Sequence, residues 1–349
     1  MLVINDLHIG VTRSGGTTVQ SQQALRDYLR DSLAALIEME DAEVVVNGDL
    51  FDNFTVDTAE VLKTADTFFD WLSSNRKATL HLIAGNHDWN PRADKVSSFH
   101  LLYQILHMSR VGERVFLYDK GFYEVGNRGD VFAIPHMANQ EAFDTEMKYA
   151  SKYDGNECYL LLHCNYKNGF AENSDHSLNI NDEQVAALMK SGWTLIIGHE
   201  HIGYELRGGR VVVVGNQFPS SVADCLGGTT KRAVEITDDG LEFVDTWSPI
   251  NHYIEINWRD ISLANLENFQ FIRVTGEATS LESAEVIKVV SALRQSHDAF
   301  VITNAVKIEG HDMSLTTESV ESIAAFDMVG AIMESLDERE QEVVKGLLP

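Results

Sequence analysis

The sequence predicts a layered α/β domain, in which buried strands alternate with amphipathic helices. Short apolar runs rich in Val, Leu and Ile recur at residues 2–5, 43–49, 79–88, 159–165, 194–201 and 210–216. The runs are continuous rather than alternating, which is typical of strands buried on both faces of a sheet. Segments with helical periodicity lie between several of these runs, and this alternation is the basis of the prediction.

Three helices are expected within the first 200 residues. Residues 22–38 place their leucines on one face of a helix. Asp57 with Glu60 predicts a capping box at the start of a second helix. Asn181 with Gln184 predicts the same arrangement at the start of a third helix.

The pattern changes after about residue 249. Residues 252–258, 269–276 and 299–308 read as strands, and residues 280–297 read as a helix. We therefore expect one domain over residues 1–249, a small α+β module over 250–314, and an acidic helical tail over 315–349.

Composition limits the classes of partner. The formal net charge of the chain is −26, which argues against a nucleic-acid partner because phosphate binding depends mainly on Lys and Arg. The cysteines Cys158, Cys164 and Cys225 show no paired spacing, which indicates reduced thiols. No apolar stretch approaches the ~18 to 20 residues of a membrane span, and the first residues do not resemble a secretory signal. We therefore expect a cytoplasmic protein that does not contact a membrane.

Polar residues follow the strand ends of all the runs except the last. They are Asp6, His8, Asp49, Asn86, His87, His163, His199 and His201. Ligand sites of α/β sheets form at the carboxyl ends of strands, so these side chains should converge. Carboxylate and amide oxygens beside imidazole nitrogens suit Mn²⁺, Mg²⁺, Fe²⁺ or Zn²⁺. Two ions about 3.5 to 4 Å apart could share Asp49 and act on a phosphoester.

Each of these motifs alone is a weak signal, because a turn residue or a satisfied polar pair is common at a strand end. Five motifs in one order, each after an apolar run, favour a metal centre over separate turns.

The order D-x-H, GD-x-x-D, GNHD, H and GH-x-H, within residues 1–247, resembles the calcineurin-like metallophosphoesterases. The resemblance implies a two-sheet β-sandwich flanked by helices in the order α-β-β-α. It implies that one metal is held by Asp6, His8, Asp49 and His201. It implies that the other is held by Asp49, Asn86, His163 and His199. His87 would then protonate the leaving oxygen, and Asp52 would orient the His87 ring.

Within this superfamily, the segments INDLHIG, NGDLFD and IAGNHD are most similar to the SbcD-type DNA repair nucleases. This similarity implies a manganese-dependent 3′ to 5′ exonuclease and single-strand endonuclease that takes part in DNA repair, recombination or replication. Compact members of this kind also occur in bacteriophages. Candidate partners are DNA, an SbcC-type ATPase and a second copy of the chain. The GNQFPSS segment departs from the Gly-Ser turn expected at that position.

Four basic residues close to the catalytic loops are candidate contacts for the DNA backbone, despite the acidic balance of the chain. They are Arg13, Arg92, Lys95 and Lys167, and Arg207 and Arg210 also follow these loops. Two other functions stay open. One is a phosphodiesterase or phosphatase that acts on small nucleotides, which the α+β module argues against. The other is a non-catalytic DNA-binding scaffold, which the full set of ligand residues argues against.

Overall fold

The computed structural model describes residues 1–12, 18–40, 42–89, 95–167 and 177–309. Contacts divide the chain into two compact units. The larger unit contains Met1–Ile254, Glu267–Phe271 and Asp298–Val301, and the smaller unit contains Glu255–Leu266, Ile272–His297 and the residues from Ile302 on. The boundaries predicted at residues 249 and 314 stay a prediction, and the predicted tail over 315–349 lies outside the described residues.

The first sheet of the larger unit has six strands in the order β14-β13-β1-β2-β3-β4. Its strands are β1 (Leu2–Ile4), β2 (Glu43–Asn47), β3 (Thr79–Ile83), β4 (Val115–Tyr118), β13 (Lys231–Thr237) and β14 (Gly240–Trp247). Strands β1 to β4 are parallel, whereas β13 runs antiparallel to β1 and forms a hairpin with β14.

The second sheet also has six strands, in the order β11-β12-β10-β7-β6-β5. They are β5 (Tyr123–Glu124), β6 (Val131–Ile134), β7 (Tyr159–His163), β10 (Thr194–Gly198), β11 (Tyr204–Leu206) and β12 (Val211–Val213). The four central strands are parallel, and the short strands β5 and β11 close the two edges in antiparallel pairing.

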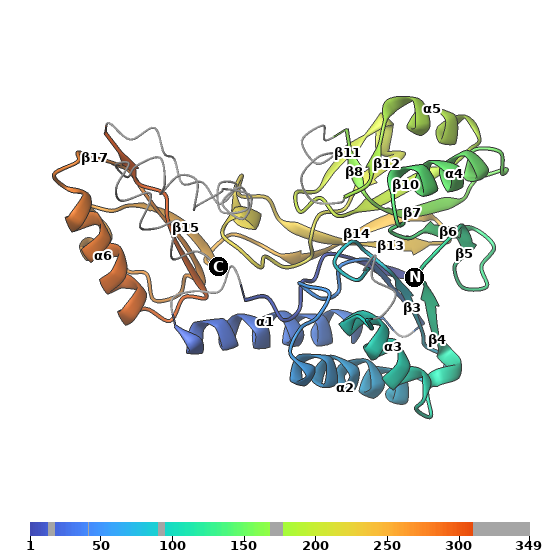
Figure 1. The fold of residues 1–349 in the computed structure, drawn as a ribbon, viewed down its shortest axis with the longest axis horizontal. Coiled ribbons are helices and arrows are strands. Elements are labelled where there is room, and N and C mark those ends of the chain that lie inside the picture. Colours follow the sequence, from blue (N-terminus) through green and yellow to red (C-terminus); the bar gives the residue numbers. More distant parts are fainter. Residues whose placement is uncertain (13–17, 41, 90–94, 168–176, 310–349) are drawn as a thin grey trace, which may run out of the picture. The chain divides into compact units, whose positions relative to one another are not determined.

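Helices cover the outer face of each sheet, so the layers follow the order α-β-β-α. Three helices, α1 (Val19–Ile37), α2 (Thr58–Ser74) and α3 (Ser98–His107), share a hydrophobic core with the first sheet. Two helices, α4 (Gln140–Ala150) and α5 (Asp182–Lys190), share a core with the second sheet. Figure 1 shows these two groups of helices on opposite sides of the sheets. The predicted fold class is therefore confirmed.

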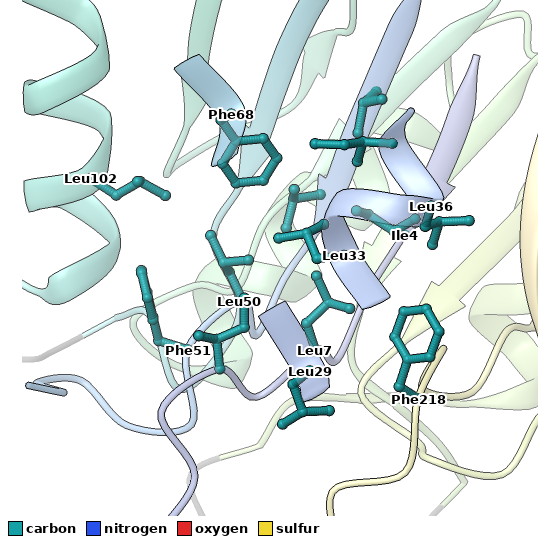
Figure 2. Close-up of a cluster of buried hydrophobic side chains, with 14 of the residues drawn as sticks. Ile4, Leu7, Leu29, Leu33, Leu36, Leu50, Phe51, Phe68, Leu102 and Phe218 are labelled. Atoms are coloured by element: carbon teal, nitrogen blue, oxygen red, sulfur yellow. The ribbon is translucent and has the colours of Figure 1, made fainter. Parts of the chain in front are cut away.

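The continuous apolar runs serve two cores at once, because alternate residues of a strand point to opposite faces. Val44 and Val46 of β2 pack into the core under the helices, whereas Val45 packs into the core between the sheets. Figure 2 shows Phe68 of α2 and Leu33 of α1 among the side chains of the core under the helices.

The two predicted capping boxes have different outcomes. At α5, the Asn181 side chain and the Gln184 side chain cap each other's backbone as predicted. At α2, Asp57 accepts from the amide of Ala59 at 2.8 Å, but Glu60 accepts from Arg30 of α1 instead. The prediction at α2 is therefore confirmed for the cap residue Asp57 and wrong for Glu60, because Glu60 forms an ion pair with the neighbouring helix instead.

The strands and the helix expected after residue 250 are present. Strands β15 (Tyr253–Asn257), β16 (Phe271–Thr275) and β18 (Val301–Asn304) form a three-stranded sheet, and helix α6 spans Ser283–Ser296. Strand β17 (Glu277–Ala278) pairs with β19 (Lys307–Ile308), and β8 (Asn165–Tyr166) pairs with β9 (Asn179–Ile180). Short 3₁₀ turns are η1 (Gly112–Arg114), η3 (Arg207–Gly209), η4 (Ala223–Cys225) and η5 (Ile261–Leu263). Across the described residues, no helix is both long and apolar enough to cross a membrane.

Candidate metal centre

The loops after β1, β2, β3, β7 and β10 bring the predicted ligands together. Three groups of side chains have ligand atoms within 4.8 Å of one another: Asp6, His8 and His201; His8, Asp49 and His87; and Asp49, His163 and His199. The ends of β1, β2 and β3 belong to the first sheet, and the ends of β7 and β10 belong to the second sheet. Each of the two predicted metal sites therefore takes ligands from both sheets.

In the group of Asp6, His8 and His201, two imidazole nitrogens face each other. The Nε2 atoms of His8 and His201 lie 3.0 Å apart. Nδ1 of His201 lies 2.7 Å from the Asp224 carboxylate, which can only accept, so the proton of a neutral ring is on Nδ1 and the lone pair is on Nε2. Nδ1 of His8 faces Asp52 at 3.5 Å, which favours the same tautomer. Two facing lone pairs repel unless a cation or a proton lies between them, so the pair fits a metal ion.

Carboxylates surround this pair of rings. Oδ2 of Asp6 accepts from the amide of His199 at 2.9 Å, and its buried Oδ1 has no hydrogen-bond partner among the described residues. Burial alone would lower the pKa of His201, but Asp224 raises it to about 9. Burial lowers the pKa of His8. A negative field that stabilises an imidazolium also attracts a divalent cation.

The group of Asp49, His163 and His199 has the same chemistry. Nδ1 of His163 donates to the carbonyl of Asn47 at 2.9 Å, so the lone pair of the neutral ring is on Nε2. That Nε2 lies 3.1 Å from Oδ1 of Asn86 and 3.3 Å from Oδ2 of Asp49. Oδ1 of Asn86 is also 2.9 Å from Nδ1 of His199. The donor atoms of these four residues therefore face one another, which fits a second cation.

Asp49 belongs to two of the three groups, one with His8 and one with His163. Its Oδ1 accepts from the amide of His87 at 2.9 Å, and its Oδ2 faces His163. Burial alone would raise the pKa of Asp49, but His163, His87 and His8 hold it well below the usual value. Burial alone would lower the pKa of His163, but Asp49 raises it to about 9. This position is the one that the sequence analysis predicted for a bridging carboxylate.

Several of these residues have left-handed backbone conformations that side chains rarely adopt. The φ angles are 52° at Asp6, 47° at His8, 50° at Asp49 and 90° at His199. Each such residue costs on the order of 1–3 kcal/mol, and strain of this kind concentrates at functional sites. The loops therefore hold the ligands at a cost that the rest of the fold must offset.

The glycines of the motifs make room for the ligands. A Cβ atom at Gly48, whose φ is +89°, would collide with the ring of His163. A Cβ at Gly85 would collide with the side chain and amide of Asp49, and one at Gly198 would lie 3.0 Å from the carbonyl of Asn47. The glycine that precedes the ligand in GD, GN and GH is thus needed for close approach.

His87 is fixed by the backbone of Asp52, which corrects one sequence-based expectation. Nδ1 of His87 donates to the main-chain carbonyl of Asp52. The Asp52 carboxylate is buried beside His8 and accepts from Asn53 at 2.8 Å. The carboxylate was expected to orient the His87 ring, but the main chain does so. The His87 side chain is 22% exposed, and its Nε2 lies 3.9 Å from Asp49.

Asp88 is a buried residue to which the sequence analysis assigned no function. Its Oδ2 accepts from the amides of Asp49 and Gly85, at 2.9 and 3.0 Å. It therefore ties the loop after β2 to the loop after β3. Burial and the charge of Asp49 raise the pKa of Asp88 to about 7. The residue is the last member of the GNHD motif, so the motif itself could have indicated it.

Asp224 and Lys231 also support the centre, and the sequence analysis missed both. Oδ2 of Asp224 accepts from the amides of Ser220 and Ser221, each at 2.9 Å, while Oδ1 holds His201. The buried Nζ of Lys231 donates to the carbonyl of His201 at 2.9 Å. Burial alone would raise the pKa of Asp224, but His201 and Lys231 lower it. No strand end precedes Asp224, so the rule that found the other residues could not find it.

The predicted DNA-contacting residues are placed only in part. Arg13 and Arg92 lie outside the described residues. Lys95 is exposed just before α3. Lys167 is exposed at the end of β8 and forms an ion pair with Asp182.

A two-sheet sandwich with two facing groups of Asp, Asn and His ligands defines a metal-dependent phosphoesterase. Residues 1–212 match the model of the calcineurin-like phosphoesterase family, and the chain belongs to this family. Members of the family use a dinuclear metal centre to hydrolyse phosphoesters.

Three solved structures resemble this chain at low sequence identity. A dimetal phosphatase from Danio rerio is 12% identical, covers 71% of this chain and 96% of its own, and has a TM-score of 0.42. A cold-active protein-tyrosine phosphatase from a psychrophilic Shewanella is 12% identical, covers 70% and 77%, and has a TM-score of 0.34. The nuclease MPE of Pseudomonas putida is 14% identical, covers 66% and 82%, and has a TM-score of 0.27. Among curated proteins, no sequence matches the chain significantly.

Proposed function

We propose that the protein is a manganese-dependent DNA nuclease of the SbcD type, with 3′ to 5′ exonuclease and single-strand endonuclease activity. The motifs INDLHIG, NGDLFD and IAGNHD support this specificity. The mixture of carboxylate, amide and imidazole donors supports manganese, and Mg²⁺, Fe²⁺ and Zn²⁺ suit the same donors. An SbcC-type ATPase and a second copy of the chain are the candidate protein partners.

The expected ligands are divided between two ions. Asp6, His8, Asp49 and His201 would hold one ion. Asp49, Asn86, His163 and His199 would hold the other. Two divalent ions at these positions would polarise the phosphate and activate water.

The position of His87 is the observation that carries the proposed chemistry. Its Nδ1 is engaged by the carbonyl of Asp52, so its partly exposed Nε2 is the atom that can hand over a proton. This nitrogen lies beside Asp49, close to both groups of ligands. A 3′ oxygen of DNA is a poor leaving group without a proton, so an imidazolium at this place assists departure of the cleaved strand.

The test compares substrates that differ in their need for this proton. Wild-type protein with Mn²⁺ should cleave linear duplex DNA from its ends, cleave single-stranded DNA, and hydrolyse bis-p-nitrophenyl phosphate. His87→Asn should slow DNA cleavage by roughly 10² to 10⁴. The loss on the aryl diester should be much smaller, because p-nitrophenolate departs without protonation.

His107→Asn is the matched control, because His107 is an exposed histidine at the end of α3, far along the chain from the ligand motifs. It should leave both activities at the wild-type level. Equal losses on DNA and on the aryl diester in His87→Asn would contradict the acid role. Hydrolysis of cyclic or free nucleotides without any cleavage of DNA would replace the nuclease by the small-substrate alternative.

A further inference from the structure

Three side-chain donors converge on one carboxylate beside the GHEH loop. The hydroxyl of Tyr166 donates to Oδ1 of Asp182 at 2.6 Å, and Nη2 of Arg207 lies 3.2 Å from the same oxygen. Lys167 forms an ion pair with the other oxygen of Asp182. The donors come from the end of β8 and from the turn after β11, whereas Asp182 is the first residue of α5.

A hydrogen-bonded connection places this cluster next to the metal centre. Glu200 lies between His199 and His201 in the sequence. Its two carboxylate oxygens accept from the amide of Tyr166 at 2.7 Å and from the hydroxyl of Tyr204 at 2.9 Å. Lys167 follows His163 by four residues, so their Cα atoms lie within about 14 Å. This upper limit corresponds to roughly four nucleotides of a stacked strand, at about 3.4 Å each.

The backbone holds the two cations in place at a cost. Lys167 and Arg207 have φ angles of 56° and 54°, and neither residue is a glycine. The amide of Lys167 donates to the carbonyl of Ile180 at 3.1 Å, which fixes the position of the residue. Backbone strain of this kind concentrates at functional sites, which supports a binding role for the two cations. Arg210, in contrast, donates to the carbonyls of Met189 and Trp193 and is structural.

The cluster has the chemistry of a phosphate site in which a carboxylate occupies the position of the anion. The pKa of Asp182 is lowered to about 2, first by Lys167 and then by Tyr166 and Arg207. The side chains of Lys167 and Arg207 stay 52% and 48% exposed, so a ligand can reach them. Exposed ion pairs contribute only about 0–1 kcal/mol, and a phosphate with more oxygens can displace such a carboxylate.

We propose that Tyr166, Lys167 and Arg207 form a subsite for a backbone phosphate of the nucleic acid strand, and that Asp182 competes with this phosphate. The inference rests on the proposed nuclease function, because only a substrate with several phosphates can place one at the metal centre and another at the subsite. The subsite attracts the strand locally on a chain whose net charge is −26. Asp182 weakens the same attraction, which favours release of the strand after cleavage.

The experiment measures binding of a single-stranded, phosphorothioate-linked oligonucleotide by fluorescence anisotropy with Mn²⁺ at several salt concentrations. Lys167→Ala and Arg207→Ala should each raise the Kd about threefold or more and reduce the salt slope by about 0.7. Asp182→Asn should lower the Kd about threefold. All three variants should hydrolyse bis-p-nitrophenyl phosphate with wild-type kcat/KM, because that substrate has a single phosphate.

Two control variants separate the subsite from a general effect of charge. Glu183→Gln removes the same charge from the neighbouring, exposed residue of α5. Lys190→Ala removes a cation eight residues further along α5, about 12 Å away. Both controls should bind the oligonucleotide as the wild type does. A Glu183→Gln effect equal to that of Asp182→Asn would overturn the competition, and unchanged binding in Lys167→Ala and Arg207→Ala would overturn the subsite.

Failure of the proposed nuclease function would give a different set of results from failure of the subsite. In that case the wild type would hydrolyse the aryl diester but neither bind nor cut DNA. The subsite is then tested with inorganic tripolyphosphate as an inhibitor of diester hydrolysis. An inhibition constant that rises in Lys167→Ala and falls in Asp182→Asn would support the subsite, and an identical constant in all variants would overturn it.

Discussion

Asp224→Asn is expected to disable one metal site through the tautomer of a histidine. The Asp224 carboxylate accepts from His201 Nδ1 on one side and from the amides of Ser220 and Ser221 on the other. An asparagine can satisfy only one side. If its oxygen faces the two serine amides, its NH₂ group faces His201, and Nδ1 must become an acceptor. The ring proton then moves to Nε2, the atom that faces His8 and should bind the metal.

The opposite orientation of the asparagine is less favourable. It would keep the His201 tautomer but direct the NH₂ group at two fixed amide donors, and each unmet buried donor costs about 1–3 kcal/mol. The wrong tautomer is therefore the expected outcome. Loss of an orienting partner of a metal-bound histidine typically weakens metal binding by about 10 to 100-fold. This range corresponds to about 1.4 to 2.7 kcal/mol of binding free energy.

Calorimetric titration of the metal-free protein with Mn²⁺ measures this effect without any substrate. Wild type should bind two ions, and Asp224→Asn should bind one ion with unchanged affinity and the other at least tenfold more weakly. Asp119→Asn is the matched control. Asp119 pairs with His100 at 3.3 Å, and neither residue is one of the candidate metal ligands. Two ions bound by Asp224→Asn with wild-type affinity would refute the tautomer argument, provided that circular dichroism shows an intact fold.

Three further predictions concern single residues. Asp49→Ala should fold but bind neither ion, because Asp49 lies between the two groups of ligands; full manganese stoichiometry by atomic absorption would contradict this. Gly48→Ala should weaken manganese binding and lower the unfolding free energy, since its Cβ would collide with His163, whereas Gly129→Ala, with a φ of +79° and open space around it, should show only the cost of the backbone. Burial lowers the pKa of His81 from 6.5 to about 4, so the unfolded state binds the extra proton between these values and wild type loses stability as the pH falls through this window. The loss of unfolding free energy amounts to at most about 3 kcal/mol and is measured by urea titrations from pH 7 to pH 4. His81→Phe should lack this loss. An equal fall in the unfolding free energy of both proteins would contradict the prediction.

The central strands of both sheets could be predicted because they are buried on both faces. Val44, Val45 and Val46 form a continuous run that needs no partner to be read as a strand. Strands at the sheet edges carry no such signal, because one face is open. Phe116 in β4 is 40% exposed and Tyr123 in β5 is 39% exposed, and the sequence analysis predicted neither strand. The division of the strands into two sheets came from the family resemblance, since no local pattern records which strands pair.

The candidate site was predictable wherever a ligand follows a buried strand directly. His163 is the last residue of β7, and Asp6 and Asn86 lie within three residues of the ends of β1 and β3. Asp224 does not, because it reaches His201 through a loop and a 3₁₀ turn that only the folded chain brings close. The contact between His87 and Asp52 was expected through the right residue but the wrong atom. A sequence shows which side chains are present but not which main-chain groups they contact, and here the main-chain carbonyl of Asp52 accepts the hydrogen bond.

Each of the two predicted metal sites takes ligands from both sheets, so bound metal would stabilise the packing of one sheet against the other. An ion held by Asp6 and His201 would link the two sheets reversibly, and the link would be lost when the metal is removed. By mass action, metal at about a hundred times its Kd adds about 2.7 kcal/mol per site to the free energy of unfolding. A variant with a weakened core between the sheets, such as Leu161→Ala, should therefore gain this term in excess manganese, as the wild type does. A chelator should remove the term and lower the Tm of both proteins.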